Sequence, residues 1–395
     1  MHHCCMGQLD FSLSEDQLAL RELSARIAKE RYESQAVKWD LAGTTLPTEE
    51  RRLLGRLGLL GATLPVEHGG GGRPLLDALV IIEEIAKVCQ LAAFPVFEAT
   101  TGAARVIELL GTPEQKLRFL PPVASGEKTI ALAVSEAEAG SAATDVQTRC
   151  EADGDEVIIN GVKRWCSGAG HAEQYLVYVR MGSEPGGKGL GAVLVDGDAP
   201  GLTYGSQQDY MGFRGIGSAD MHFDNVRVSR DNVIVGKGGF KKLFAAFSIE
   251  RLGNATMSLA IGQSCIDRSS VYVQQRRQFG RELIDFQLVQ ANLADMIIQV
   301  EAARLLVYRA AINASHGAPA ALEASIAKCF ANEMAKRVSD LAIQLHGGYG
   351  YTAEYTVERL HRDAHGWAIA GGTANMQRLR VVSEYLGRRL NQRRD

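Results

Sequence analysis

The sequence predicts an α+β protein built from three consecutive parts: helices, then strands, then helices again. Apolar residues recur at helical spacing in the first and last parts, while short β-rich runs separated by turn signals fill the middle. No helical stretch interrupts those strands, which favours an antiparallel barrel or sandwich over a doubly wound sheet. We therefore expect a helical domain over residues 1–125, a β domain over 126–237 and a helical bundle over 238–395.

The first part opens with a capped helix. Ser14 provides an N-cap, and Gln17 lies at the third helical position, where its side chain can complete a capping box. Apolar residues follow at near-helical spacing, and the same pattern returns over residues 75–88. Between these helices, Gly69–Gly72 has no preceding strand and no following Lys-Ser/Thr, so we interpret it as a loop rather than a phosphate-binding turn.

Short runs of β-forming residues fill the middle part. They cover residues 129–134, 156–159, 174–179, 191–195 and 221–223. Asp153-Gly154 and Asn160-Gly161 are strong turn signals on either side of the second run. There is no strand–GxGxxG–helix unit, which argues against a Rossmann nucleotide site.

Two apolar stripes at helical spacing mark the last part. One consists of Leu293, Met296, Ile297, Val300 and Val307, and the other of Ile326, Phe330, Met334, Val338, Leu341 and Leu345. Such stripes predict core packing between the helices of a bundle.

Composition narrows the class of protein. A chain of 395 residues can bury a large core, and its net charge of −3 gives no reason to expect nucleic acid or an anionic membrane surface as a partner. Seven scattered cysteines without ligand spacing suit a reducing compartment. His2, His3, Cys4 and Cys5 lie together on a terminus that we expect to be unstructured rather than metal-binding. Since no apolar run reaches transmembrane length, we expect a soluble cytoplasmic protein without a metal site.

Motifs spread over nearly the whole chain resemble the signatures of the acyl-CoA dehydrogenases. They are Ser135–Ser141, Asn160–Ser167, Gln275–Gly280 and the C-terminal stretches 344–351, 357–364 and 370–378. Ala137 and Glu138 replace the Pro-Gly that is usual in the first motif, and Asn375 replaces a Glu or Gln in the last. The resemblance implies an N-terminal helical domain, a middle antiparallel β-barrel and a C-terminal four-helix bundle.

The resemblance also implies FAD as cofactor, and the residue types suit its flavin ring. An isoalloxazine needs a flat apolar wall, which Trp165 offers, and hydrogen-bonding groups for its polar edge, which Ser135 and Ser167 offer. Outside these motifs, Trp165 would be interpreted as an ordinary half-buried strand aromatic. Further cofactor contacts implied by the family pattern come from Leu132, Val134, Gln278, Phe279, Thr373 and Asn375.

For the pyrophosphate, the family pattern implies charge and close backbone approach. It places Arg276 of one subunit against Gln344, Gly347 and Gly348 of a neighbour. Alone, Arg276 would be interpreted as a solvated helix residue. A site shared between chains implies a dimer, and the family usually forms a homotetramer that is a dimer of dimers.

One position departs from the family in a way that bears on catalysis. In many members a catalytic glutamate directly precedes the Gly-Thr pair, and that position is Gly371 here. Glycine retains the backbone N–H that helps stabilise the enolate oxygen in the family, but it cannot accept a proton. In isovaleryl-CoA dehydrogenase and similar branches the base instead precedes an arginine on a helix, and Glu250-Arg251 occupies the matching place.

We therefore expect Glu250 to be the general base, with a pKa raised by burial. The alternative is a glutamate that pairs with Arg251 or favours a helix N-terminus.

The acyl group is predicted from residue size and charge. Ala370 and Gly371 are small where many relatives carry Tyr-Glu, which predicts a wide pocket for a branched, cyclic or aromatic group. Segment 90–96 carries no positive charge, which argues against glutaryl-like or sulfinyl substrates. The expected substrate contacts are Phe94, Ser141, Arg251, Ala370 and Gly372.

The leading hypothesis is FAD-dependent α,β-dehydrogenation of an acyl-CoA, with the β-hydride passing to flavin N5 and the electrons then to an electron-transferring flavoprotein. A second hypothesis keeps this chemistry but takes the acyl group from a carrier protein. A third is a flavin oxygenase or lyase on the same fold. A fourth, a nucleic-acid-binding flavoprotein without turnover, is disfavoured by the net charge of −3.

Overall fold

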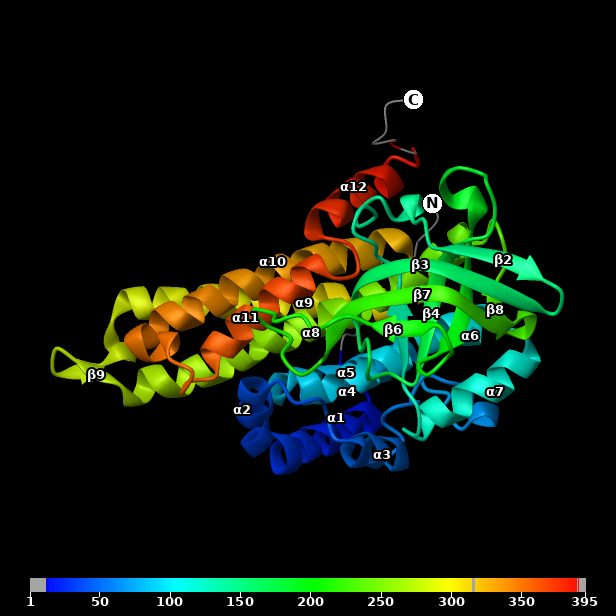
Figure 1. Cartoon of the computed structure of the whole chain (residues 1–395). Coiled ribbons are helices and arrows are strands. Elements are labelled where there is room, and N and C mark those ends of the chain that lie inside the picture. The colour runs from blue at the N-terminus through cyan, green and yellow to red at the C-terminus, as the bar shows by residue number, and fades with distance from the viewer. Residues whose placement is uncertain (1–11, 315–316, 389, 391–395) are drawn as a thin grey trace, which may run out of the picture.

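Helices, a sheet and a long helical bundle follow one another along the computed structural model, which describes residues 12–314, 317–388 and 390 (Figure 1). The paired cysteines and histidines near the N-terminus lie outside these residues. The N-terminal helices are α1 (Glu15–Ile27), α2 (Glu33–Ala42), α3 (Thr48–Arg56), α4 (Leu75–Val88), α5 (Gln90–Thr100), α6 (Ala103–Leu110) and α7 (Pro113–Ala124). The predicted capping box is confirmed, since Ser14 Oγ accepts from the N–H of Gln17 and Gln17 Oε1 accepts from that of Ser14. Gly69–Gly72 is a loop before α4, as expected.

The middle part forms one sheet. Its strands are β1 (Ile130–Ala133), β2 (Arg149–Asp153), β3 (Glu156–Ser167), β4 (Gln174–Arg180), β5 (Leu190–Asp196), β6 (Leu202–Tyr204), β7 (Ser218–Ser229) and β8 (Val233–Val235). Neighbouring strands follow the order β6-β7-β3-β2-β4-β5-β8, with β1 added beside β4. The sheet is mostly antiparallel, as expected, with two exceptions: β1 pairs with β4 in parallel from Ile130↔Gln174 to Ala133↔Val177, and β2 pairs with β4 in parallel at Arg149↔Arg180.

One predicted turn is also wrong. Asp153-Gly154 does connect β2 to β3, but Asn160-Gly161 lies inside β3. The register between β3 and β7 shifts at Gly161, where φ is +147° and an added Cβ would lie 2.7 Å from the Cα of Thr148. Glycine therefore serves a bulge and a close strand approach at this point, not a turn.

The C-terminal part consists of long helices joined by a short hairpin. The elements are α8 (Phe240–Gln275), β9 (Arg277–Gln278), β10 (Arg281–Glu282), α9 (Gln287–Ile312), α10 (Ala321–His346), α11 (Val357–Ile369) and α12 (Ala374–Tyr385). Most of both apolar stripes is buried or partly buried, but Ile297 and Phe330 are 44% and 38% exposed. These two side chains are therefore free to meet another surface.

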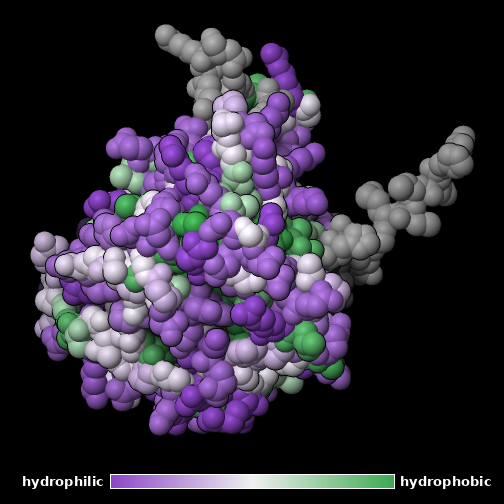
Figure 2. All heavy atoms as spheres, turned by 45° about the vertical axis from the view of Figure 1, so that its right-hand side comes forward, coloured by the Kyte–Doolittle hydropathy of each residue, from purple (hydrophilic) through white to green (hydrophobic). Residues whose placement is uncertain are grey.

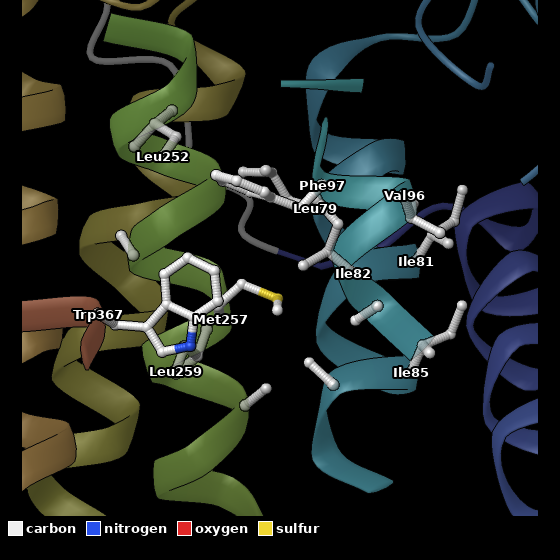
Figure 3. Close-up of a cluster of buried hydrophobic side chains, with 14 of the residues drawn as sticks. Leu79, Ile81, Ile82, Ile85, Val96, Phe97, Leu252, Met257, Leu259 and Trp367 are labelled. Atoms are coloured by element: carbon white, nitrogen blue, oxygen red, sulfur yellow. The ribbon is translucent and has the colours of Figure 1, made fainter. Parts of the chain in front are cut away.

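The hydrophobic core is continuous between the first and last parts. Side chains from α4 and α5, such as Ile82 and Phe97, face Met257 of α8, with Trp367 of α11 packed beside it (Figure 3). The rings of Phe97 and Trp367 lie 5.4 Å apart, edge to face. This packing fixes α5, α8 and α11 relative to one another, and these helices carry most of the candidate site.

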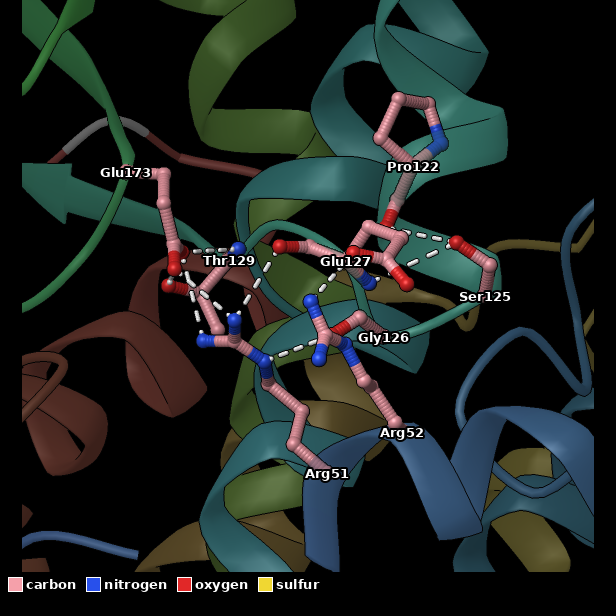
Figure 4. Close-up of polar contacts among 8 residues, drawn as sticks. All are labelled: Arg51, Arg52, Pro122, Ser125, Gly126, Glu127, Thr129 and Glu173. Carbon is pink, nitrogen blue, oxygen red and sulfur yellow. Dashed lines mark hydrogen bonds and ion pairs between the residues drawn. The ribbon is translucent and has the colours of Figure 1, made fainter. Parts of the chain in front are cut away.

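A partly buried polar junction joins the helical part to the sheet (Figure 4). The Arg51 guanidinium bonds Glu173 Oε1 at 2.8 Å, and its Nε donates to the Gly126 carbonyl at 2.8 Å. Glu173 also accepts from the N–H of Thr129 at 2.7 Å. The connection between the two parts is therefore ordered by specific hydrogen bonds.

Two further observations concern the surface. The face in Figure 2 is largely hydrophilic, with apolar side chains scattered over it. No helix in the described part of the chain has the length and apolar character needed to cross a bilayer.

Candidate active site

Glu250 and Gly371 lie next to each other although 121 positions separate them in the sequence. Glu250 lies on α8 and is 7% exposed. A Cβ atom added to Gly371 would be 2.5 Å from Glu250 Oε1 and 2.7 Å from Oε2. The carboxylate therefore occupies the space that any side chain at position 371 would need.

Glu250 is a buried acid whose charge is only partly compensated. Burial raises its pKa, while the positive charges of Lys328 and Arg251 oppose that rise. Its Oε2 atom is buried and finds no hydrogen-bond partner within the described residues. A poorly solvated carboxylate of this kind is suited to accept a proton.

Two other titratable side chains face Glu250. Glu98 of α5 is half-buried, with its Oε2 atom shielded from solvent, and desolvation together with the charge of Glu250 raises its pKa to about 8. Burial and the same charge also raise the pKa of Tyr178, on β4. Glu98 Oε2 and the Tyr178 hydroxyl, like Glu250 Oε2, are buried without a partner in the part of the chain that is described.

The loop that carries Gly371 connects α11 to α12. Gly371 and Gly372 have φ values of +64° and +89°, a left-handed conformation that glycine adopts without strain. No acceptor among the described residues takes the N–H of Gly371. Thr373 is the N-cap of α12, and its Oγ accepts from the N–H of Met376, so its hydroxyl hydrogen is still available to a ligand.

Trp165 stands out on β3. Its indole is 50% exposed and its φ is +60°, which is uncommon for a residue other than glycine, at a point where the β3–β7 register shifts again. The Arg164 guanidinium lies 4.4 Å from the indole ring, and Tyr210 packs 6.3 Å away. The backbone thus turns a flat aromatic surface outward.

The segment around Ser135 is tied to the same strand. The Ser135 carbonyl accepts from the N–H of Arg164 at 2.8 Å, which brings Ser135 close to Trp165. Behind them, Lys163 Nζ is fully buried and bonds the Val134 carbonyl at 3.0 Å and Glu136 Oε1 at 2.8 Å. Ser167, at the end of β3, pairs with Ser218 of β7.

A second group of expected cofactor residues lines one pocket at the far end of the bundle. The pocket has a volume of about 510 Å³. Its walls include Tyr272, Arg276, Gln278, Leu283, Gln344, His346, Gly347, Gly348 and Tyr349. We call it the hairpin pocket because it adjoins the β9–β10 hairpin.

The expected division of these residues between two subunits is wrong. Arg276 and Gln344 belong to the same pocket of one chain, because α8 and α10 run side by side and end together (Figure 1). The Arg276 guanidinium lies 5.5 Å from the ring of Tyr349. The sequence could not decide this, since it does not tell which helices are neighbours.

The hairpin pocket lies far from Glu250 within the chain. Helix α8 carries Glu250 and ends at Gln275, next to the pocket. The 25 residues between them, at a rise of about 1.5 Å each, place Gln275 about 38 Å from Glu250. Strand β3 lies toward the opposite end of the molecule from β9 (Figure 1). Phe279 lies in the turn between β9 and β10, where its side chain is 94% exposed and its φ is +51°.

The other expected substrate and cofactor residues are near the site or on its periphery. Phe94 packs against Phe97 and Trp367 in the aromatic cluster. Arg251 is 4% exposed, and its Nε and Nη1 atoms have no partner within the described residues; burial and the nearby Arg380 lower its pKa to about 10. The remaining members are half-buried Leu132, Val134 and Ala370 and exposed Ser141, Gly372 and Asn375.

Buried polar residues near Glu250 were missed from the sequence. They are Tyr178, Asn254, Ser258, Lys328 and Asn332, together with half-buried Glu98. A signal was present: Glu250, Asn254 and Ser258 recur every four residues on α8, and Lys328 and Asn332 are four residues apart on α10. Residues spaced in this way share one helix face.

Among the described residues there is no cluster of three or more His, Cys, Asp or Glu side chains able to hold a metal ion.

Comparisons with known proteins identify the class. The family models described as acyl-CoA dehydrogenase N-terminal, middle and C-terminal domains match residues 14–127, 131–226 and 237–386. A probable acyl-CoA dehydrogenase of Bacillus subtilis, YngJ, is 36% identical, covering 96% of this chain and all of the relative. A 3-sulfinopropanoyl-CoA desulfinase of Paraburkholderia xenovorans is 37% identical, covering 97% and 99%. The solved butyryl-CoA dehydrogenase of Megasphaera elsdenii has a TM-score of 0.92 at 32% identity, covering 96% and 100%.

The chain belongs to the acyl-CoA dehydrogenase family and has its fold. It is thus an oxidoreductase of a family whose members are FAD flavoproteins. The resemblance inferred from the motifs is confirmed.

Proposed function

We propose that this chain catalyses the FAD-dependent α,β-dehydrogenation of an acyl thioester, with Glu250 as the base that removes the α-proton. The observation that carries the proposal is the contact between the Glu250 carboxylate and Gly371, the position at which many relatives carry their glutamate. The Glu250 carboxylate, which comes from α8, lies where the Cβ atom of a side chain at position 371 would be. The site therefore has an acid in this space, but a different helix supplies it.

The site also offers a donor for the charge that develops as the α-proton leaves. The N–H of Gly371 has no acceptor in the described part of the chain, and it lies beside the base. A donor placed at the thioester oxygen lowers the barrier to enolisation, because negative charge accumulates there in the transition state. Arg251, with two unpartnered guanidinium nitrogens, would bind a polar part of the pantetheine arm.

The residues present fit FAD. Bound FAD would supply the acceptor for the β-hydride. Trp165 would cover the flavin ring, with Ser135, Ser167 and Thr373 as hydrogen-bonding partners, and the hairpin pocket would take the pyrophosphate end. Supporting this, the Trp165 indole is held outward by a strained backbone that an ordinary strand position does not require.

The two parts of this cofactor site lie at opposite ends of one chain, which favours an assembly of at least two chains. A single dinucleotide cannot bridge the length of α8 between them. The exposed Phe279 and the protruding hairpin suit contact with a second subunit. We propose a homotetramer built from two such dimers, and an electron-transferring flavoprotein as electron acceptor.

The acyl preference needs one correction. The argument that Gly371 widens the pocket fails, because Glu250 fills the space gained. The prediction of a branched, cyclic or aromatic acyl group now depends only on the small size of Ala370. An acyl group with a distal negative charge is disfavoured, because the ionisable group that α5 places near Glu250 is the acid Glu98 and not a cation.

Anaerobic bleaching of the flavin tests the proposal. Branched, cyclic, aromatic and straight acyl-CoAs are each mixed with the holoenzyme, and we expect one class to bleach the visible absorbance rapidly. Glu250→Gln should slow bleaching by at least about 1,000-fold, because a neutral amide of equal size cannot accept the proton. Near-normal bleaching by Glu250→Gln would show that the base is elsewhere.

A carrier-tethered acyl group is the second candidate, because the pantetheine arm is common to both substrates. If no CoA ester bleaches the flavin, the same acyl groups are tested on a phosphopantetheinyl carrier protein. Bleaching only by the carrier-bound form would identify this second substrate class. Failure of both forms would instead favour non-dehydrogenase chemistry on this fold.

A further inference from the structure

Lys328 bonds the backbone on both sides of Gly371. It lies on α10 and is fully buried, and its Nζ donates to the carbonyls of Ala370 at 2.8 Å and Gly372 at 3.1 Å. A third bond, at 3.1 Å, goes to Asn332 Oδ1 one helical turn away. The three hydrogens of the ammonium group thus have well-placed acceptors, two of them in the Gly371 loop.

The loop carbonyl receives a second donor from α8. Asn254 Nδ2 donates to the Ala370 carbonyl at 3.3 Å. Asn332 Nδ2 in turn donates to Asn254 Oδ1 at 2.9 Å and to Ser258 Oγ at 2.8 Å. Each of these four side chains is buried, so α8, α10 and the loop share one connected polar network.

Burying an ammonium group to bond two carbonyls carries a large desolvation penalty. Burial lowers the pKa of Lys328 to about 8, and the charge of Glu250 opposes that change. A neutral donor would bond the carbonyls without this desolvation penalty. The positive charge therefore calls for an explanation beyond loop geometry, and Glu250 supplies one.

The groups that face Glu250 are of mixed sign. Arg251 on α8 and Lys328 on α10 favour its charged form. Glu98 on α5 and Tyr178 on β4 interact with its negative charge, which disfavours their own ionisation. Of the two cations, only Lys328 also bonds the loop that presents the Gly371 N–H.

We propose that Lys328 is a positioning residue for α-proton abstraction. It fixes the Gly371 loop beside Glu250, and it supplies a positive charge close to both the Glu250 carboxylate and this loop. The inference rests on the proposed function of Glu250. Proton removal by the carboxylate and donation by the Gly371 N–H both depend on one side chain that touches neither substrate nor cofactor. Lys328 couples the base to the oxyanion donor.

Proton abstraction can be measured apart from hydride transfer. tert-Butylacetyl-CoA has α-hydrogens but no β-hydrogen, so it can be enolised and cannot be dehydrogenated. In D₂O, the wild-type holoenzyme should replace the α-hydrogens of this thioester by deuterium. The exchange is measured by mass spectrometry over a range of pH. Glu250→Gln should abolish this exchange.

Lys328→Met tests the inference, because methionine has a similar length and carries neither charge nor donor. We expect exchange to slow by about 10- to 100-fold. We also expect the acid limb of the pH profile to move up by about one pH unit or more, because a charge that favours ionised Glu250 is lost. The matched control is Lys336→Met on the same helix, whose amine pairs with Glu333 and should leave rate and profile unchanged.

Asn254→Ala provides a second variant if Lys328→Met retains too little FAD. It removes one donor to the Ala370 carbonyl without changing charge, so exchange should slow while the acid limb stays in place. Lys328→Met that folds, binds FAD and exchanges within about threefold of wild type at an unshifted pH would overturn the role of Lys328. Absence of exchange and of flavin bleaching in the wild type would instead count against the proposed function itself.

Discussion

Substitution of Gly371 by alanine tests the central contact of the site. The new Cβ would lie 2.5 Å and 2.7 Å from the Glu250 carboxylate oxygens, closer than real Cβ contacts allow. The substitution also places a side chain on a backbone with a φ of +64°. Two separate penalties are therefore expected, and only the first depends on Glu250.

The two penalties have different expected sizes. A left-handed alanine costs about 1–2 kcal/mol in the free energy of unfolding. Displacing a buried carboxylate from a packed site adds about 1–3 kcal/mol. In a Glu250→Ala background the second term disappears, so a double-mutant cycle should give a coupling of about 1–3 kcal/mol.

Thermal unfolding of all four proteins, at one protein concentration and with excess FAD, measures the cycle. For a chain of 395 residues, 1 kcal/mol corresponds to roughly 1 °C in Tm. Gly371→Ala should therefore lower Tm by about 2–5 °C in the wild type and by about 1–2 °C beside Glu250→Ala. Equal losses in both backgrounds would show that the carboxylate does not occupy the space beside Gly371.

Two more predictions use residues outside this contact. Glu98 has a folded pKa of about 8, above its unfolded value, so its contribution to stability is complete at low pH and is lost as pH rises toward about 8. Glu98→Gln should therefore raise Tm, and the difference in Tm from wild type should grow from about pH 5 to about pH 9. A difference that does not change with pH would contradict the raised pKa of Glu98. Phe279→Asp should lower subunit association, measured by sedimentation, together with bound FAD, measured by absorbance. Leu117→Asp, a control at another exposed apolar side chain, on α7, should change neither, and full FAD retention by a monomeric Phe279→Asp would refute the shared cofactor site.

Local sequence patterns were sufficient for much of the fold. Ser14 and Gln17 predicted a capped helix because a capping box involves residues only three positions apart. The same reasoning failed at Asn160-Gly161, a dipeptide typical of turns that the structure places at a strand bulge. The local backbone preference was satisfied either way, and only the neighbouring strand β7 decided which form occurred.

For the candidate site, the sequence indicated the residues but not their spatial relations. Glycine at position 371 and an acid at 250 were both visible, and their pairing was a hypothesis drawn from the family. Whether Arg276 and Gln344 line one pocket or two could not be predicted, because it depends on which ends of α8 and α10 meet. The four-residue spacing of Lys328 and Asn332 showed that they share one face of α10, but not that this face meets the Gly371 loop.

The sequence by itself therefore determined the order of helices and strands, the family and the absence of an acid at position 371. These follow from residue type and spacing, which act over a few positions along the chain. Tertiary structure alone decided that the Glu250 carboxylate fills the space above Gly371, and that Lys328 bonds the carbonyls on either side of it. Those contacts join residues more than forty positions apart, so they exist only once α8, α10 and the α11–α12 loop are packed together.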